Sequence, residues 1–196
     1  MSSGSTTSSA RERLLAAADR LFYEQGVNSV GIDRVIEEAG VAKASLYSIF
    51  GSKEQLVVAY LRGRLERQRE HTMSAIAKLD TPRDRILAAF DALDGLIHEP
   101  PFNGCAFINA SAEAQDDSAI AQAARESLVW SRGLFTDLAR DLGAANPEGL
   151  ARQLVMLYYG ALIAARMDQE LNAALTARAA AEVLVDSVTK SRRRRQ

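Results

Sequence analysis

Hydrophobic residues along this 196-residue chain recur at intervals of three and four, which is the spacing of amphipathic helices. Breaks in the pattern coincide with helix-ending glycines such as Gly26 and Gly40, and with a capping residue followed by proline at Thr81-Pro82. No segment alternates between polar and apolar residues as a half-buried strand would. The pattern predicts an all-α fold of about nine helices, at residues 10–25, 32–39, 43–50, 53–78, 82–98, 105–114, 116–142, 147–171 and 173–188.

The third predicted helix is too short to form a core element by itself. Its apolar residues Leu46, Ile49 and Phe50 recur on one face and are predicted to fasten it to the two helices before it. The opposite face carries the small side chains of Ala44, Ser45 and Ser48. Two short helices joined by a tight turn that contains glycine are typical of a helix-turn-helix, whose second helix enters the major groove of DNA. Small hydroxyl side chains can bond base edges there, and an alanine methyl can contact a thymine methyl.

Three stretches of the sequence resemble a known family. They are LLAAADRLFYEQG in the first helix, IDRVIEEAGVAKASLY in the helix-turn-helix, and FGSKEQLV leading into the fourth helix. From Arg11 to Leu61 the chain resembles the DNA-binding domain of the tetracycline-repressor (TetR) family. It departs from the family pattern at Gly31, where many members have Ser or Thr as a helix cap, and at Ile49, where many have His or Tyr.

The resemblance implies a homodimeric transcriptional regulator, usually a repressor, that binds a near-palindromic double-stranded DNA operator and is released by a small-molecule effector. The DNA contacts that it implies come from Lys43, Ala44, Ser45, Tyr47, Ser48 and Lys53. The expected organisation is a disordered N-terminal arm (1–9), a helix-turn-helix DNA-binding domain (10–53), a helical ligand-binding and dimerisation domain (54–189) and a basic tail (190–196).

The longest uncharged run, LVMLYYGALIAA at 154–165, is too short for a membrane span, which needs about 20 apolar residues. It is apolar nearly all round, so we expect a helix that is covered on both sides. Either it is the central helix of a monomer, or it pairs with a second copy of the chain, as the last two major helices do in dimers of the family. The second alternative predicts a dimer interface at Leu154, Tyr158, Gly160, Ala161, Ala164 and Ala165.

An effector pocket is predicted among the fourth to eighth helices, with an apolar or aromatic ligand as its occupant. The candidate lining residues are Tyr60, Arg64, Phe90, Ile97, Phe107, Asn109, Trp130 and Tyr158.

Charge and cysteine content refine this picture. The formal net charge is −1, but residues 190–196 hold five basic side chains and no acidic one, so the rest of the chain is acidic. Residues 1–53 are neutral, with six basic and six acidic side chains, and a neutral segment binds DNA if its charges are sorted onto faces. The single Cys105 excludes an intramolecular disulfide and favours a reducing cytoplasm.

Two alternatives from other classes are a small helical enzyme and a helical protein-binding module without DNA binding. A di-iron helical bundle needs two Glu-x-x-His pairs, but the residues three before His71 and His98 are Gln68 and Gly95. A protein-binding module predicts no salt-dependent DNA binding and leaves the helix-turn-helix without a role. We therefore expect no catalytic residue, no metal and no cofactor.

Overall fold

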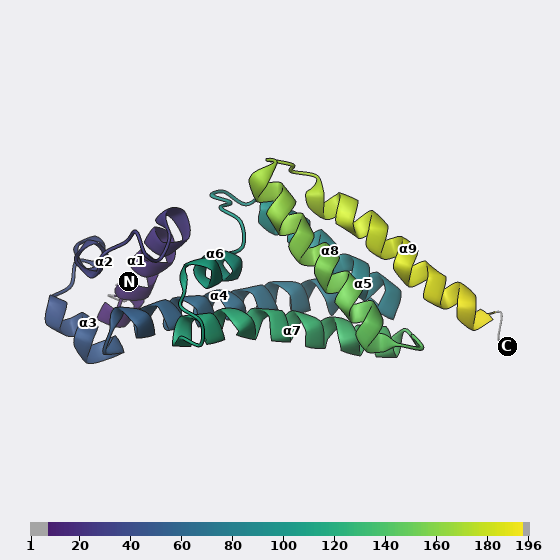
Figure 1. Ribbon diagram of the computed structural model, residues 1–196, viewed down its shortest axis with the longest axis horizontal. Helices are drawn as coiled ribbons and strands as arrows, with labels where there is room; N and C mark the ends of the chain where they lie inside the picture. The colour runs from purple at the N-terminus through teal and green to yellow at the C-terminus, as the bar shows by residue number, and fades with distance from the viewer. Residues whose placement is uncertain (1–7, 194–196) are drawn as a thin grey trace, which may run out of the picture. The chain divides into compact units, whose positions relative to one another are not determined.

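The computed structural model describes residues 8–193, with side chains up to residue 188, and its described residues form an all-α fold, as predicted (Figure 1). Its helices are α1 (Ala10–Gln25), α2 (Ile32–Ala39), α3 (Lys43–Phe50), α4 (Lys53–Ile76), α5 (Pro82–His98), α6 (Ala106–Glu113), α7 (Ala119–Asp141), α8 (Pro147–Met167) and α9 (Ala173–Arg193). The predicted bounds of α1, α2, α3 and α5 match residue for residue, whereas α4 and α8 end earlier than predicted and α9 ends later. Most of the predicted N-terminal arm and the end of the basic tail lie outside the described residues.

Side-chain caps begin the helices that carry a strong local start signal. The Thr81 hydroxyl accepts a hydrogen bond from the backbone N–H of Asp84 at the start of α5, and Asn146 does the same for Gly149 at the start of α8. In contrast, α2 and α3 begin at Gly31 and Ala42 without any side-chain cap. The two helices of the predicted DNA-binding motif therefore depend on tertiary packing for their stability.

The described residues divide into two compact units, which are treated separately below. The first comprises residues 8–64 and 106–125, so it contains α1, α2, α3, the start of α4, α6 and the start of α7. The second comprises residues 65–105 and 126–193, with the rest of α4 and α7 and all of α5, α8 and α9.

In the first unit, α3 is held against its neighbours by a narrow apolar stripe. Leu46 is completely buried, and Phe50 is half-buried beneath the guanidinium group of Arg11, which lies 5.7 Å from the ring centroid. Ile49 is 37% exposed, so the prediction that it fastens α3 to the other helices is wrong. At about 100° per residue, Ile49 falls on the far side of Leu46 from Phe50, at the edge of the buried stripe.

The core of the second unit lies where α5, α8 and α9 pack on one another. Phe90, Phe135 and Tyr158 meet there with ring centroids 5.8 to 6.0 Å apart. Such aromatic contacts add to the free energy gained from burying the rings.

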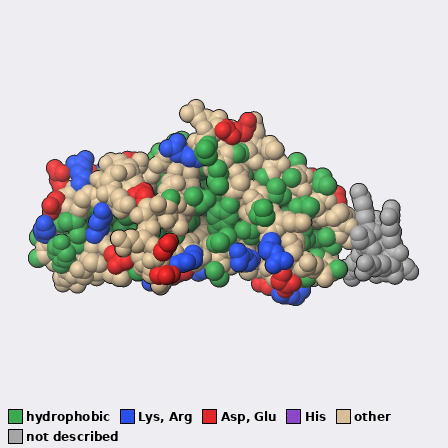
Figure 2. Space-filling view, viewed as in Figure 1, with side chains coloured by type: hydrophobic (Ala, Val, Ile, Leu, Met, Phe, Trp, Pro, Cys, Tyr) green, Lys and Arg blue, Asp and Glu red, His purple; other side chains and the backbone are tan. Residues whose placement is uncertain are grey.

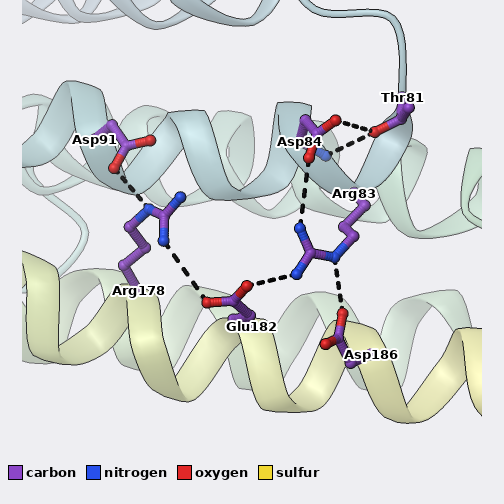
Figure 3. Close-up of polar contacts among 7 residues, drawn as sticks. All are labelled: Thr81, Arg83, Asp84, Asp91, Arg178, Glu182 and Asp186. Carbon is purple, nitrogen blue, oxygen red and sulfur yellow. Dashed lines mark hydrogen bonds and ion pairs between the residues drawn. The ribbon is translucent and has the colours of Figure 1, made fainter.

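Ion pairs join α5 to α9 along the edge of this core (Figure 3). Arg83 donates to Asp186 at 2.8 Å and also to Glu182, while Arg178 lies 2.7 Å from Asp91. Glu182 lies between the two arginines and pairs with both. Each arginine has a carboxylate partner on the opposite helix, so the network links α9 to α5 beside their apolar contact.

Candidate nucleic-acid interface

The outward face of α3 has the features expected of a recognition helix. Ala44, Ser48 and Tyr47 are exposed, and Tyr47 leaves 47% of its surface open to solvent. Ser45 is half-buried beside them. Because α3 is anchored through the completely buried Leu46 and the half-buried Phe50, its exposed face stays available for a partner, and the small side chains there allow close approach to base edges.

Lys43, the first residue of α3, is paired with a carboxylate on α2. Its ammonium group donates to Asp33 Oδ1 at 2.8 Å, and this contact raises the pKa of Lys43. Both side chains are exposed, so the pair lies at the surface where α2 and α3 meet.

Lys53, the first residue of α4, lies in a different environment. It is half-buried, and burial lowers the pKa of its ammonium group, while the nearby Glu113 carboxylate opposes that shift. It is therefore less accessible to a phosphate than Lys43 is.

Glu113 at the end of α6 clamps the loop between α1 and α2. Its carboxylate accepts a hydrogen bond from the backbone N–H of Asn28 at 2.6 Å, and the Asn28 side-chain amide donates back to the Glu113 carbonyl at 2.9 Å. Gly26, which ends α1, has φ of +88°, and a Cβ added to it would lie 2.7 Å from Glu113 Oε1. The backbone conformation therefore requires glycine here, and the nearby carboxylate would have to shift to admit a Cβ.

The predicted effector-pocket residues divide between the two units. Four belong to the first unit, where Tyr60 packs edge-to-face on Phe22, and Arg64 donates twice to Asp19 and stacks 3.7 Å from the ring centroid of Tyr23. These four are Tyr60, Arg64, Phe107 and Asn109; the four in the second unit are Phe90, Ile97, Trp130 and Tyr158. Arg64 has its charge satisfied by Asp19, which gives it a structural role in joining α1 to α4.

A cluster of hydroxyl groups lies within the apolar interior of the second unit. Ser127 and Ser131 on α7 are buried, and both lie within hydrogen-bond distance of the Tyr159 hydroxyl, at 3.1 and 3.4 Å. Thr72 on α4 is buried too and hydrogen-bonds Tyr158. Among the described residues, these two serines and Thr72 are the only polar or charged residues that are fully buried.

Gln68 of α4 joins the two halves of this hydroxyl cluster, because it hydrogen-bonds both Ser127 and Tyr158. Burial raises the pKa of Tyr158 and of Tyr159, so both phenols stay protonated at neutral pH. The cluster is therefore polar but uncharged.

The predicted dimer-interface residues lie on two faces of α8. Four of the six fill the core of their own unit: Leu154, Tyr158, Ala161 and Ala165. Gly160 is exposed and Ala164 is half-buried. The large apolar side chains that α8 leaves exposed are Met156, at 74%, Ile163 and Met167, and α9 likewise exposes Leu175 and Val183. Figure 2 shows hydrophobic side chains at the surface over α8 and α9.

Two structural tests bear on other classes of function. Among the described residues, no group of three His, Cys, Asp or Glu side chains is arranged to hold a metal ion. Within the same part of the chain, no helix is long and apolar enough to cross a membrane.

Sequence reasoning missed Asp33, Glu113 and the hydroxyl cluster. Asp33 and Glu113 act on residues 10 and 85 positions away, and no spacing rule connects such pairs. The hydroxyl cluster did leave a signal, because Ser127 and Ser131 are four residues apart on the face of α7 that also carries Phe135.

Comparison with known proteins identifies the same motif. The family model for bacterial regulatory proteins of the tetR family matches residues 14–60. The HTH-type transcriptional regulator BetI of Rhizobium meliloti is 30% identical over 175 residues, which cover 85% of each chain. The HTH-type transcriptional repressor NemR of Escherichia coli is 28% identical over 171 residues, covering 81% of this chain and 85% of its own.

Among solved structures, a TetR-family transcriptional regulator from Streptomyces coelicolor aligns with a TM-score of 0.85 and 34% identity, covering 91% of this chain and 95% of its own. The matched proteins are transcriptional regulators and not enzymes.

Proposed function

Since this chain belongs to the TetR family of transcriptional regulators, which bind DNA through a helix-turn-helix, we propose that it is a ligand-responsive repressor. In this proposal it binds a near-palindromic operator as a homodimer and is released by a small-molecule effector. The repressor role is supported by the match to NemR, which extends over most of both chains.

The observation that carries the DNA-binding part of the proposal is the exposed face of α3. A helix seated by one completely buried leucine, with Ala44, Tyr47 and Ser48 exposed, is suited to the major groove. Tyr47 and Lys43 are suited to phosphates, which position the protein without reading sequence.

The first experiment measures binding to DNA from upstream of the protein's own gene by fluorescence anisotropy across a salt series. We expect Tyr47→Ala and Lys43→Ala to weaken binding, whereas the control Lys78→Ala, an exposed lysine outside the motif, leaves it unchanged. Equal losses in all three variants would contradict the assignment of α3 as the recognition helix. Transcription from the same DNA in vitro then tests whether the protein represses or activates, since a repressor lowers the yield of transcript.

Dimerisation is proposed through the exposed faces of α8 and α9. A pair of recognition helices about 34 Å apart would read successive major grooves, so the proposed operator requires two copies of the chain. Met156→Lys and Ile163→Lys place a charge on the exposed face of α8 without disturbing the core, and we expect both to shift light-scattering mass toward the monomer. Val129→Lys, an equally exposed apolar position on α7, is the control. Dimers that persist in both α8 variants would exclude this face.

The effector site is proposed at the hydroxyl cluster of the second unit, next to Trp130 on α7. An uncharged cluster among apolar side chains favours a neutral, largely apolar ligand with hydrogen-bonding groups. A thermal-shift screen of neutral, anionic and cationic aromatic compounds tests this proposal, with Ser127→Ala beside the wild type. Stabilisation by strongly charged compounds alone, or equal stabilisation of Ser127→Ala, would refute it.

A further inference from the structure

In the protein without DNA, the charged side chain of the proposed recognition helix is already engaged in an ion pair. Lys43 is the only charged residue in α3, and its ammonium group lies 2.8 Å from Asp33 Oδ1. The two side chains are 58% and 81% exposed, so neither is held in place by burial. An acidic residue thus occupies the surface beside the helix that reads DNA.

The other charges of α2 are also paired. Arg34 contacts Glu37 at 2.9 Å, and Glu38 pairs with Arg20 of α1. Figure 2 shows basic and acidic side chains interspersed over this end of the first unit. Lys43 is therefore the one cation that α3 could offer to a phosphate, and Asp33 competes for it.

Phosphates and base edges treat a carboxylate differently. Phosphate oxygens carry negative charge and only accept hydrogen bonds, so a carboxylate repels them, and non-specific binding consists almost entirely of phosphate contacts. Base edges in the major groove also present amino donors, on cytosine N4 and adenine N6, to which a carboxylate can bond. A carboxylate beside the recognition helix therefore weakens binding to random DNA more than binding to a site that places a donor opposite it.

We propose that Asp33 is a specificity-determining residue. By pairing with Lys43 it keeps that lysine from contacting phosphates non-specifically, and so it increases the ratio of the affinity for operator to the affinity for other DNA. This inference rests on the proposed function, because it assigns a role within operator recognition. A purely structural role for the Asp33–Lys43 pair predicts something else: loss of the pair would loosen α2 against α3 and weaken binding to every DNA alike.

The test uses full-length protein and two duplexes of equal length and composition. One is the sequence that the wild type selects from a random pool, and the other is its scrambled version. Asp33→Asn removes the charge and keeps the shape. Glu37→Gln is the matched control. It removes an exposed carboxylate from the same helix, but this carboxylate pairs with Arg34 and not with Lys43.

For Asp33→Asn we expect binding to the scrambled duplex to tighten about eightfold at 0.1 M salt. The slope of log K against the logarithm of the salt concentration should become steeper by about 0.9, which is the change expected when one further phosphate is neutralised. Affinity for the selected duplex should change by less than about threefold, since there the donor opposite Asp33 already releases Lys43 to a phosphate, and the amide oxygen that replaces the carboxylate can still accept a hydrogen bond from that donor. Glu37→Gln should leave the ratio of the two affinities unchanged. In a Lys43→Gln background, the effect of Asp33→Asn on the scrambled duplex should largely disappear.

Two results overturn the inference while leaving the proposed function intact. In the first, the wild type selects a sequence but Asp33→Asn leaves the affinity ratio unchanged or weakens both duplexes equally. In the second, Glu37→Gln tightens non-specific binding as much as Asp33→Asn does, which would make the effect one of net charge alone. A wild type that selects no sequence refutes the proposed function itself, and the specificity role of Asp33 fails with it.

Discussion

Replacing Gly26 with alanine tests the clamp between α6 and the end of α1. Gly26 has φ of +88° and ψ of 155°, a combination that is essentially restricted to glycine. A methyl group there would also lie 2.7 Å from Glu113 Oε1, so the flexible carboxylate must shift, which disturbs the bond that its other oxygen accepts from the Asn28 amide. Both effects oppose folding of the first unit.

The magnitude follows from these two contributions. Backbone strain at such a position costs about 1–3 kcal/mol. The displaced hydrogen bond is charge-assisted but exposed to solvent, so we assign it about 1 kcal/mol. We expect Gly26→Ala to lower the free energy of unfolding by about 2–4 kcal/mol, and Glu113→Ala to lower it by about 1 kcal/mol. Because the double variant loses the shared contact only once, its cost should be less than the sum of the single costs by about 1 kcal/mol.

Urea denaturation followed by circular dichroism measures these free energies. Gly95→Ala is the control, since Gly95 lies within α5, has no atom within 4 Å of an added Cβ, and should become more stable by about 0.5–1 kcal/mol. A cost below about 0.5 kcal/mol for Gly26→Ala would refute the strained conformation. Full additivity in the double variant would refute the contact with Glu113.

Three further predictions concern stability. Ala42→Ser should raise the free energy of unfolding by about 0.5–1 kcal/mol in the same urea assay. The reason is that Ala42 has the extended conformation of an N-cap but no polar side chain to cap α3. An unchanged urea midpoint would argue against that conformation. Burial raises the pKa of Tyr158 above its usual value near 10, so its stabilising contribution is present below about pH 10 and is lost as the pH rises further. Tyr158→Phe should therefore lessen the fall in stability above pH 10, and identical pH profiles would contradict the raised pKa. Arg83→Gln leaves carboxylates of α9 without their partner on α5 and should cost about 0.5–1.5 kcal/mol at low salt and less at 1 M salt. Arg34→Gln, which removes an exposed pair within α2, should cost under about 0.5 kcal/mol at either salt concentration.

The helix bounds that could be predicted are those set by local signals. Gly40 ends α2 in a left-handed conformation, and the Thr81-Pro82 pair begins α5, so both ends are visible in the sequence. The end of α8 has no such signal. The chain leaves the helix after Met167 and passes through Gln169 at φ of +54°. A positive φ is uncommon for residues other than glycine, so the sequence does not predict it at a glutamine.

In the candidate site too, features set by local helix geometry could be predicted, and features set by tertiary packing could not. Periodicity correctly placed Leu46 inward and Ala44 and Ser48 outward, because both follow from helix geometry. The same rule failed for Ile49, because an eight-residue helix touches its neighbours along too narrow a stripe to bury every apolar position near it. The partners of Lys43 depend on how α2 packs against α3, which residue spacing does not encode.

The charges of the DNA-binding segment can now be understood through their arrangement. Residues 1–53 are neutral overall, which by itself suits a DNA-binding protein poorly. Of the two lysines expected to contact DNA, Lys43 bonds Asp33, and Lys53 is half-buried near Glu113. Since each of these two cations has a carboxylate nearby, the two lysines add little to long-range attraction to a phosphate backbone. Under the proposed function, discrimination between operator and genome would then rest on the fit of α3 to base edges and on the donors that an operator places opposite Asp33.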